Sequence, residues 1–139
     1  MNTPTAPAAV NAYFDALLTA NRELYATAFT EDAVAHDPAG AQPIAGRELI
    51  VALLGVTTTW WSRYEGLTPK ETFTSGDVTS VRWIGRGKTY DGRDINWAGI
   101  TTFLLDDQGL IHTLYAVYDG EKLARELHHR QPPRLGELS

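Results

Sequence analysis

The sequence predicts an α+β fold, with N-terminal helices packed on one face of a curved antiparallel sheet. Apolar residues recur at helical spacing in the first half of the chain, and from Thr68 onward their period changes to two, as in strands. Helices followed by a run of successive strands are typical of α+β proteins. A strongly curved sheet with a helix across its open side forms a cone, and the apolar interior of a cone can bind small ligands.

The first half of the chain predicts three helices. Asn21 suits a break between the first helix and a shorter second helix over residues 22–29. A third helix begins at Arg47 and ends near Trp60 and Trp61. The apolar face of the first helix consists of Val10, Tyr13, Phe14, Leu17 and Leu18.

Four successive antiparallel strands are predicted in the second half of the chain. They are separated by residues that favour tight turns, namely Ser75-Gly76-Asp77, Asp91-Gly92 and Asp106-Asp107-Gln108-Gly109. The segment GEKLARELHHR then fits a short closing helix or an extended cover. The strands are predicted over residues 68–74, 78–86, 95–105 and 110–118.

Length and composition favour one soluble domain. We place this domain over residues 1–131 of the 139, followed by a flexible tail over residues 132–139. The net charge is −5 with no basic cluster, so we expect the chain to bind neither nucleic acid nor a membrane surface. Cysteine is absent and the N-terminus lacks a signal-peptide pattern, which indicates a cytoplasmic protein.

The sequence predicts no metal site and no cofactor. Without cysteine there is no thiolate ligand set, and the adjacent His128 and His129 lack the spacing of a histidine metal site. Gly85, Gly87 and Gly92 lie among predicted strands, whereas a phosphate-binding loop joins a strand to a helix N-terminus.

The segment AVAHDPAGAQPIAG, residues 33–46, contains the predicted catalytic group. Its apolar, strand-like start leads into Asp37, and Pro38 favours extended backbone at that position. A carboxylate at the mouth of an apolar pocket is harder to ionise than one in water, so its pKa rises toward that of a useful general base. The alternative is an Asx-type turn that ends a strand.

Tyr13 is the predicted partner of Asp37. It lies on the apolar face of the first helix, where a buried hydroxyl needs a partner and can donate a hydrogen bond to a developing oxyanion. The alternative is a core aromatic with a solvated hydroxyl. His112 is interpreted as a polar pocket group or a satisfied core histidine, and His36 as structural or dimer-facing.

The segments MNTP, YFDAL, LYATAFTEDAVAHDPAG and PIAGRELI together resemble the opening of the ketosteroid isomerase family, which shares the SnoaL-like or nuclear-transport-factor-2-like fold. The resemblance resumes at Gly92-Arg93, at Phe103 and at Gly109. It implies a conical α+β barrel, a homodimer and a flat hydrophobic small-molecule substrate.

The resemblance also implies roles for single residues. The general base falls on Asp37 and the oxyanion-hole tyrosine on Tyr13. The second oxyanion donor, a protonated acid in the isomerases, falls on Thr101, whose hydroxyl donates only a neutral hydrogen bond. A supporting tyrosine of that family falls near Leu54, and an acid of the related polyketide aldol cyclases falls on Ala116.

We therefore expect cofactor-independent proton transfer on a steroid- or polyketide-like substrate, most similar to ketosteroid isomerisation. Two alternatives are an epoxide-opening cyclase or hydrolase with Glu65 as a second acid, and a non-catalytic ligand-binding or interaction module. The expected pocket walls are Phe14, Leu54, Trp60, Trp97, Phe103, Leu114, Ala116 and Tyr118.

Overall fold

The computed structural model describes residues 6–129, so the tail expected over residues 132–139 lies outside the described range. The helices are α1 (Ala8–Thr19), α2 (Arg22–Thr27), α3 (Arg47–Thr58) and α4 (Gly120–His129). The strands are β1 (Phe29–His36), β2 (Ile44–Ala45), β3 (Arg63–Ser75), β4 (Val78–Lys88), β5 (Asp94–Leu105) and β6 (Ile111–Tyr118).

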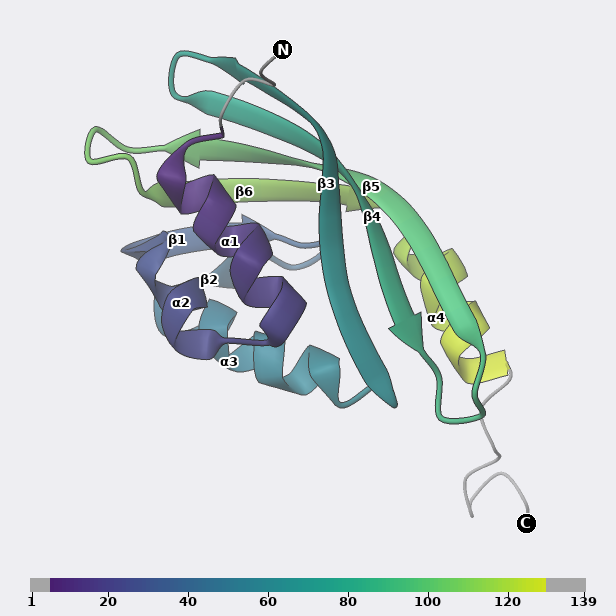
Figure 1. Cartoon of the computed structure of the whole chain (residues 1–139). Coiled ribbons are helices and arrows are strands. Elements are labelled where there is room, and N and C mark those ends of the chain that lie inside the picture. Colours follow the sequence, from purple (N-terminus) through teal and green to yellow (C-terminus); the bar gives the residue numbers. More distant parts are fainter. Residues whose placement is uncertain (1–5, 130–139) are drawn as a thin grey trace.

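The strands form one six-stranded sheet in the order β2-β1-β6-β5-β4-β3. Neighbouring strands are antiparallel except β1 and β6, which run parallel. The long strands β3, β4 and β5 bend over α1, with α2 and α3 beside it (Figure 1). The predicted α+β cone is therefore confirmed.

Local signals set the ends of the first helices. α1 ends before Ala20, which adopts the left-handed conformation with φ 52°. The Asn21 side chain then caps α2 by accepting a hydrogen bond from the Leu24 N–H at 3.1 Å. α2 stops at Thr27, before the predicted end, because Phe29 begins β1.

The sheet is larger than the predicted run of four strands. β3 begins at Arg63, ahead of the predicted start at Thr68, because it pairs with β4 as far as Lys88. β1 pairs with β6 through residues that are far apart in the sequence, including Ala35 and Leu114. Alternation within one segment does not reveal such a non-local pairing, so the sequence predicts only a strand-like start to the Asp37 segment.

A β-bulge at His112 changes the phase of β6. Leu104 of β5 pairs with Thr113 and Leu105 pairs with Ile111, which leaves His112 without a counterpart. Leu114 is buried while His112 is exposed, and the His112 ring forms a hydrogen bond with the Thr113 hydroxyl at 2.7 Å. The interpretations of His112 as a polar pocket group or a core histidine are therefore wrong.

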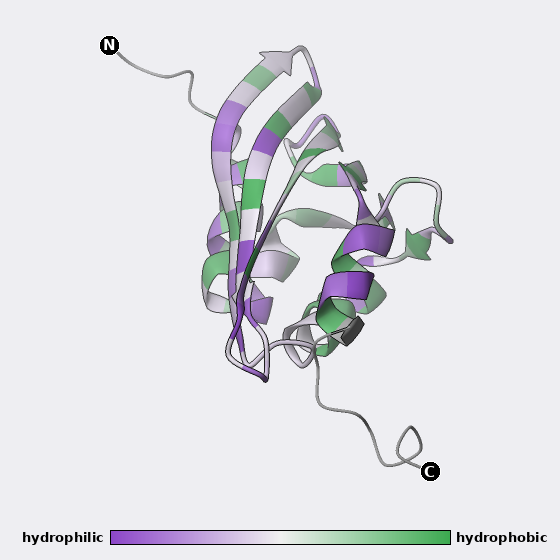
Figure 2. Ribbon diagram, turned by 90° about the vertical axis from the view of Figure 1, so that its right-hand side faces the viewer, coloured by the Kyte–Doolittle hydropathy of each residue, from purple (hydrophilic) through white to green (hydrophobic). Residues whose placement is uncertain are grey.

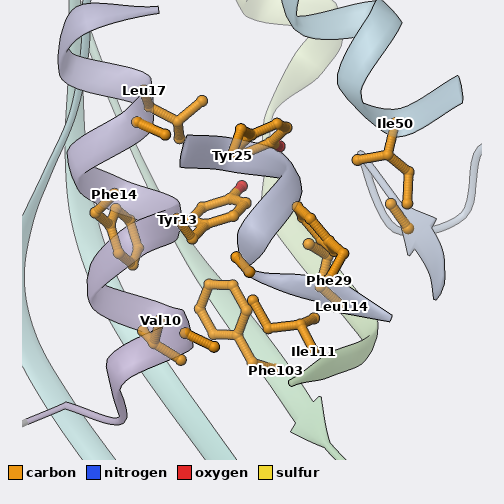
Figure 3. Close-up of a cluster of buried hydrophobic side chains, with 14 of the residues drawn as sticks. Val10, Tyr13, Phe14, Leu17, Tyr25, Phe29, Ile50, Phe103, Ile111 and Leu114 are labelled. Carbon is orange, nitrogen blue, oxygen red and sulfur yellow. The ribbon is translucent and has the colours of Figure 1, made fainter. Parts of the chain in front are cut away.

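A densely packed aromatic core occupies the cone between α1, α2, β1 and β5 (Figure 3). The Tyr13 ring meets the Phe14 and Phe103 rings edge to face, with centroids 5.0 and 4.9 Å apart. Phe14 and Phe103 are fully enclosed here and do not line the cavity described below. The prediction that they form pocket walls is wrong, because they pack deeper in the cone.

α4 covers a second, smaller apolar cluster. Its Leu127 is buried against Trp61 and Ile95, and Arg93 in the turn between β4 and β5 donates a hydrogen bond to the Glu126 carbonyl at 3.0 Å. Figure 2 shows apolar and polar residues mixed along this helix and along the long strands. Within residues 6–129, no helix has both the length and the apolar character needed to span a membrane.

Candidate functional site

A cavity of about 280 Å³ lies between the concave face of the sheet and helices α1, α2 and α3. Its walls are mostly aliphatic and aromatic, and Asp37 is the one charged side chain among the described residues that line it. The volume is close to the lower end of the range of small-molecule pockets, about 300–1,000 Å³. The cavity therefore favours a neutral, largely apolar ligand that can interact with one carboxyl group.

Asp37 follows directly after β1, and the neighbouring turn is tied to the sheet. The Ala39 N–H donates to the Ala116 carbonyl of β6 at 2.7 Å, and the Ala41 N–H donates to the Pro38 carbonyl at 3.1 Å. The peptide bond between Asp37 and Pro38 is cis. These contacts hold the carboxyl group at the end of β6, where the Tyr118 hydroxyl donates to Asp37 Oδ1 at 3.0 Å.

The environment of Asp37 favours its protonated form. Burial raises the pKa of the Asp37 carboxyl above its ordinary value of 3.8, and the hydrogen bond from Tyr118 lowers it in part. A carboxyl group with a raised pKa accepts a proton more readily than one in water, and it can do so without a second charged group nearby. The carboxyl group thus has the properties of a general base.

Three further tyrosines lie around the carboxyl group, in addition to Tyr118. Burial raises the pKa of Tyr13, Tyr25 and Tyr64 above their ordinary values, and the negative charge of Asp37 raises each of them further. Burial and the Asp37 charge also raise the pKa of Tyr118. All of these phenols therefore stay protonated and can act as hydrogen-bond donors.

Tyr25 and Tyr64 are absent from the predicted site, although both line the cavity. Tyr25 lies on the apolar face of α2. A tyrosine on the apolar face of a predicted helix is the pattern that identifies Tyr13, so the same pattern could have identified Tyr25. Tyr64 lies near the start of β3, in a stretch for which the sequence predicts no element.

Thr101 is fully buried and lines the cavity from β5. The indole Nε1 of Trp83 donates a hydrogen bond to its Oγ1 at 2.8 Å. The position to which the resemblance assigns an acid is thus occupied by a neutral hydroxyl with its own buried hydrogen-bond partner.

Tryptophans form the wall near α4. The indoles of Trp61 and Trp97 stack at an interplanar angle of 11° with centroids 5.1 Å apart. Trp97 lies directly over Gly85 and Trp61 over Gly87, so that a Cβ at either glycine would overlap an indole ring. Trp60, at the rim of the cavity, is 54% exposed. The sequence predicts Trp60 and Trp97 in this wall but misses Trp61.

Glu65 lies outside the cavity. Its carboxylate accepts hydrogen bonds from Arg63 Nε at 3.1 Å and Nη2 at 2.9 Å, in a pair that solvent reaches. The structure therefore contradicts the prediction of Glu65 as a second acid of the site, because its partner holds it on the surface. The predicted residues that the structure does bring to the cavity are Tyr13, Asp37, Leu54, Trp60, Trp97, Thr101, Leu114, Ala116 and Tyr118.

The described residues contain no group of three or more histidine and acidic side chains able to hold a metal ion. α4 ends at His128 and His129, but the positions of these two side chains are not among the described features. Among the described residues that line the cavity, Asp37 is a single carboxyl group surrounded by phenols.

A sequence model of the SnoaL-like domain matches residues 10–113. The chain matches no curated protein sequence.

Solved structures with the same fold include a protein from Jannaschia sp. CCS1 described as a SnoaL-like polyketide cyclase, with a TM-score of 0.77 and 18% identity over 95% of this chain and 100% of that one. TerC, co-crystallised with polyporic acid, has a TM-score of 0.74 and 14% sequence identity, over 86% of this chain and 95% of TerC. A Mycobacterium tuberculosis protein in complex with estradiol-17beta-hemisuccinate has a TM-score of 0.72 and 20% sequence identity, over 84% of this chain and 97% of that protein. At these identities the likeness establishes the shared fold.

Proposed function

The chain belongs to the SnoaL-like domain family, and from this premise we propose that it is a cofactor-independent enzyme that moves a proton on a hydrophobic small molecule, in the manner of ketosteroid isomerases. The observation that carries the proposal is the carboxyl group of Asp37, which lies in an apolar cavity and accepts a hydrogen bond from Tyr118. This environment tunes the carboxyl group as a base.

In the proposed reaction, Asp37 removes a proton from the carbon next to a substrate carbonyl. The electron pair moves onto the carbonyl oxygen, and the Tyr13 hydroxyl, kept protonated by its burial, donates a hydrogen bond to that oxygen. Asp37 then returns the proton to a second carbon, which gives the double-bond isomer. The substrate and product have the same atoms and electrons, so the reaction consumes no second reactant.

Two structural neighbours support a hydrophobic ligand for this cavity, since they were crystallised with polyporic acid and with estradiol-17beta-hemisuccinate. The apolar walls of the cavity suit such a molecule, and the only charge that its described lining carries is the acidic group of Asp37. We therefore propose an uncharged ketone as the substrate class.

Epoxide opening needs one group that protonates the leaving oxygen and another that activates the attacking oxygen. The position of Glu65 on the surface removes the second carboxyl group on which that alternative depends. A non-catalytic binding module remains the second candidate, because Thr101 lies at the position where the resemblance assigns an acid.

The variant Asp37→Asn tests the proposed reaction. It keeps the shape of the side chain and removes its basicity, so turnover of a β,γ-unsaturated ketone should fall by about 10²- to 10⁴-fold, with ligand affinity largely kept. Steady-state kinetics with the ketone, together with a direct binding measurement, check this result.

The matched control is Asp15→Asn, the same substitution on the exposed face of α1. Full turnover by Asp37→Asn would contradict the proposed mechanism. Tight binding of ketones by the wild-type protein, with no turnover of any ketone or epoxide, would favour the binding module.

We also propose that two copies pair through the outer face of β5 and β6. Ile100 and Val117 are cross-strand neighbours on this face and both are exposed. Beside them the Tyr115 ring stacks on His36 with centroids 4.4 Å apart. The outward positions of the paired region carry no charge, and a two-fold axis would place this uncharged surface against itself. The outward positions in question are Ile100, Thr102, Leu104, Thr113, Tyr115 and Val117.

A further inference from the structure

Helix α3 lines the cavity with two sets of residues. One set is the buried face of the helix, with Ile50 and Leu54. The other set is spaced at i, i+3, i+4 and i+7, so it follows one side of the helical winding and lies beside the buried face. We call this second set the mouth stripe, and its members are Leu53, Val56, Thr57 and Trp60.

The mouth stripe extends from the cavity to the solvent. Val56 is 48% exposed and Trp60 is 54% exposed, although both line the cavity. Single exposed apolar residues are common on protein surfaces. Exposed apolar residues that continue the wall of a pocket are different, because joined apolar surface of this kind marks a binding site.

The backbone on both sides of Trp60 is anchored. Trp60 follows α3 in a turn that continues the helical winding, since its N–H donates to the Thr57 carbonyl at 3.1 Å. The Tyr90 hydroxyl donates to the Thr59 carbonyl, and Trp61 is buried beneath α4. The exposed indole is therefore held beside the cavity, and a ligand that contacts it orders little additional backbone.

The size of the cavity indicates what covers this surface. Its volume of about 280 Å³ is slightly below the range typical of small-molecule pockets, about 300–1,000 Å³. A ligand larger than the cavity has to extend through the mouth, where Val56 and Trp60 offer it apolar surface. The mouth stripe carries no charge, so a hydrocarbon chain that covers it removes apolar surface of both partners from water.

We propose that the mouth stripe is a binding site for an apolar extension of the ligand, such as an alkyl chain, and that Trp60 determines how strongly chain length raises affinity. The inference rests on the proposed function for the identity of the cavity as the substrate site. It adds the shape of the substrate, with the ketone inside the cavity and a hydrocarbon tail that crosses the mouth.

The first test measures the affinity of 4-alkylcyclohexanones whose chains grow from methyl to octyl. Wild-type affinity should rise along the series. Trp60→Ala should weaken binding of the octyl ketone by about 3- to 10-fold and leave binding of the methyl ketone unchanged, because only the longer chain reaches the indole. Trp60→Phe keeps an aromatic ring and should retain most of the gain.

Val56→Ala and Leu49→Ala form a matched pair for the same series. Both residues lie on α3 and they are 48% and 49% exposed, but only Val56 lines the cavity. Val56→Ala should weaken binding of the octyl ketone by about 2- to 4-fold and leave the methyl ketone unaffected. Leu49→Ala should change the affinity for neither ketone.

Protection of Trp60 from solvent is the second measurement, made on the wild-type protein. Trp60 is the most exposed of the four tryptophans, so aqueous iodide should quench its fluorescence most strongly. The octyl ketone should reduce this quenching and the methyl ketone should not. In Trp60→Phe the protection by the octyl ketone should be absent.

The inference would be overturned if Trp60→Ala weakened every ketone of the series by the same factor or weakened none, or if the octyl ketone left iodide quenching unchanged. A shift of oligomeric state in both Trp60→Ala and Leu49→Ala, without an effect of chain length, would assign this face of α3 to a protein partner and would also overturn it.

These outcomes are separate from a failure of the proposed function, because equilibrium binding does not require turnover. Asp37→Asn should lose turnover and keep the preference for long chains. A wild-type protein with that preference and no turnover would contradict the enzyme proposal alone, whereas turnover of ketones that is insensitive to Trp60→Ala at every chain length would contradict only the present inference.

Discussion

Asp37 and Tyr118 are in direct contact, and their effects on proton affinity oppose each other. Burial raises the pKa of the Asp37 carboxyl, while the hydroxyl of Tyr118 lowers it by donating to the charged form. The two effects together set the pH at which the base becomes available. The Tyr118 hydroxyl therefore matters for the pH range of activity, even though Asp37 makes the proton transfer in our proposal.

Tyr118→Phe should move the acidic limb of the pH–rate profile to higher pH. The variant loses the hydrogen bond that stabilises the carboxylate, so the pKa of Asp37 rises further and less of the base is ionised at a given pH. Turnover measured as a function of pH checks this shift. A fall in activity by the same factor at every pH would indicate that Tyr118 has another role.

The raised pKa of Asp37 also predicts how stability depends on pH. The folded state binds the proton more tightly than the unfolded chain, so the stability that this group contributes is present below its ordinary pKa of 3.8 and is lost as pH rises through the raised value. Asp37→Asn cannot ionise. Relative to wild type, the variant should therefore be more stable, with a larger free energy of unfolding, at neutral pH than at pH near 3 (about one unit below the ordinary value).

Urea denaturation at the two pH values measures this difference. Asp15→Asn, on the exposed face of α1, gives the effect of losing one surface charge. If the two variants changed stability in parallel across the pH range, burial of the Asp37 carboxyl would not be the cause.

Strand β4 shows why particular glycines are needed in this sheet. Gly85 and Gly87 are buried on the inner face of β4, and the indoles of Trp97 and Trp61 occupy the space where their side chains would be. An ideal Cβ would lie 2.3 Å from Trp97 Cε2 at Gly85, and 2.4 Å from Trp61 Cε3 at Gly87. The stacked tryptophans therefore depend on the two glycines beneath them.

Gly87→Ala should destabilise the fold by about 1–3 kcal/mol, the usual range for overpacking. The added methyl group must displace the Trp61 ring, which is buried beneath α4 and stacked on Trp97. Chemical denaturation followed by tryptophan fluorescence measures both the stability and the disturbance of the stack.

Gly55→Ala in α3 provides the matched control with the opposite expected sign. The nearest atom to its added Cβ is Arg22 Nη1 at 3.5 Å, an ordinary contact, and alanine favours a helix interior over glycine by about 1 kcal/mol. Equal effects of the two substitutions would show that the tryptophans move aside freely.

At the scale of the whole molecule, the curved sheet separates two apolar surfaces. The inner face encloses the core and the cavity, while the outer face of β5 and β6 leaves Ile100 and Val117 exposed to solvent. Side chains alternate along each strand, so the same strands supply both surfaces. Our proposal assigns the inner surface to the substrate and the outer one to a second copy of the chain.

Val117→Lys should convert the proposed dimer to a monomer, because it places a charge among the uncharged outward positions of the paired region of β5 and β6. Sedimentation equilibrium of wild type and variant measures the change. Leu49→Lys, at an exposed position of α3 on the helical layer, is the control and should leave the dimer intact. A wild-type monomer at all concentrations would contradict this proposal.

The fold class and most of the elements can be predicted from the amino-acid sequence, because periodicity and turn residues act locally. The patterns of α1, β4 and β5 match their observed positions closely, and the Asp-Pro pair marks the carboxyl group that the structure places in the cavity. The pattern fails at His112, where the bulge in β6 depends on pairing with β5.

The depth of each inward-facing residue in the cone cannot be predicted from the sequence, because it depends on how the whole chain packs. Phe103 and Thr101 share one face of β5 and both are fully buried, yet only Thr101 is among the residues that surround the cavity. The contact of Tyr118 with Asp37 and the position of Glu65 beside Arg63 likewise depend on the tertiary structure. Alternation reports which face of a strand a residue occupies, whereas depth depends on how the sheet curves and where the helices close it.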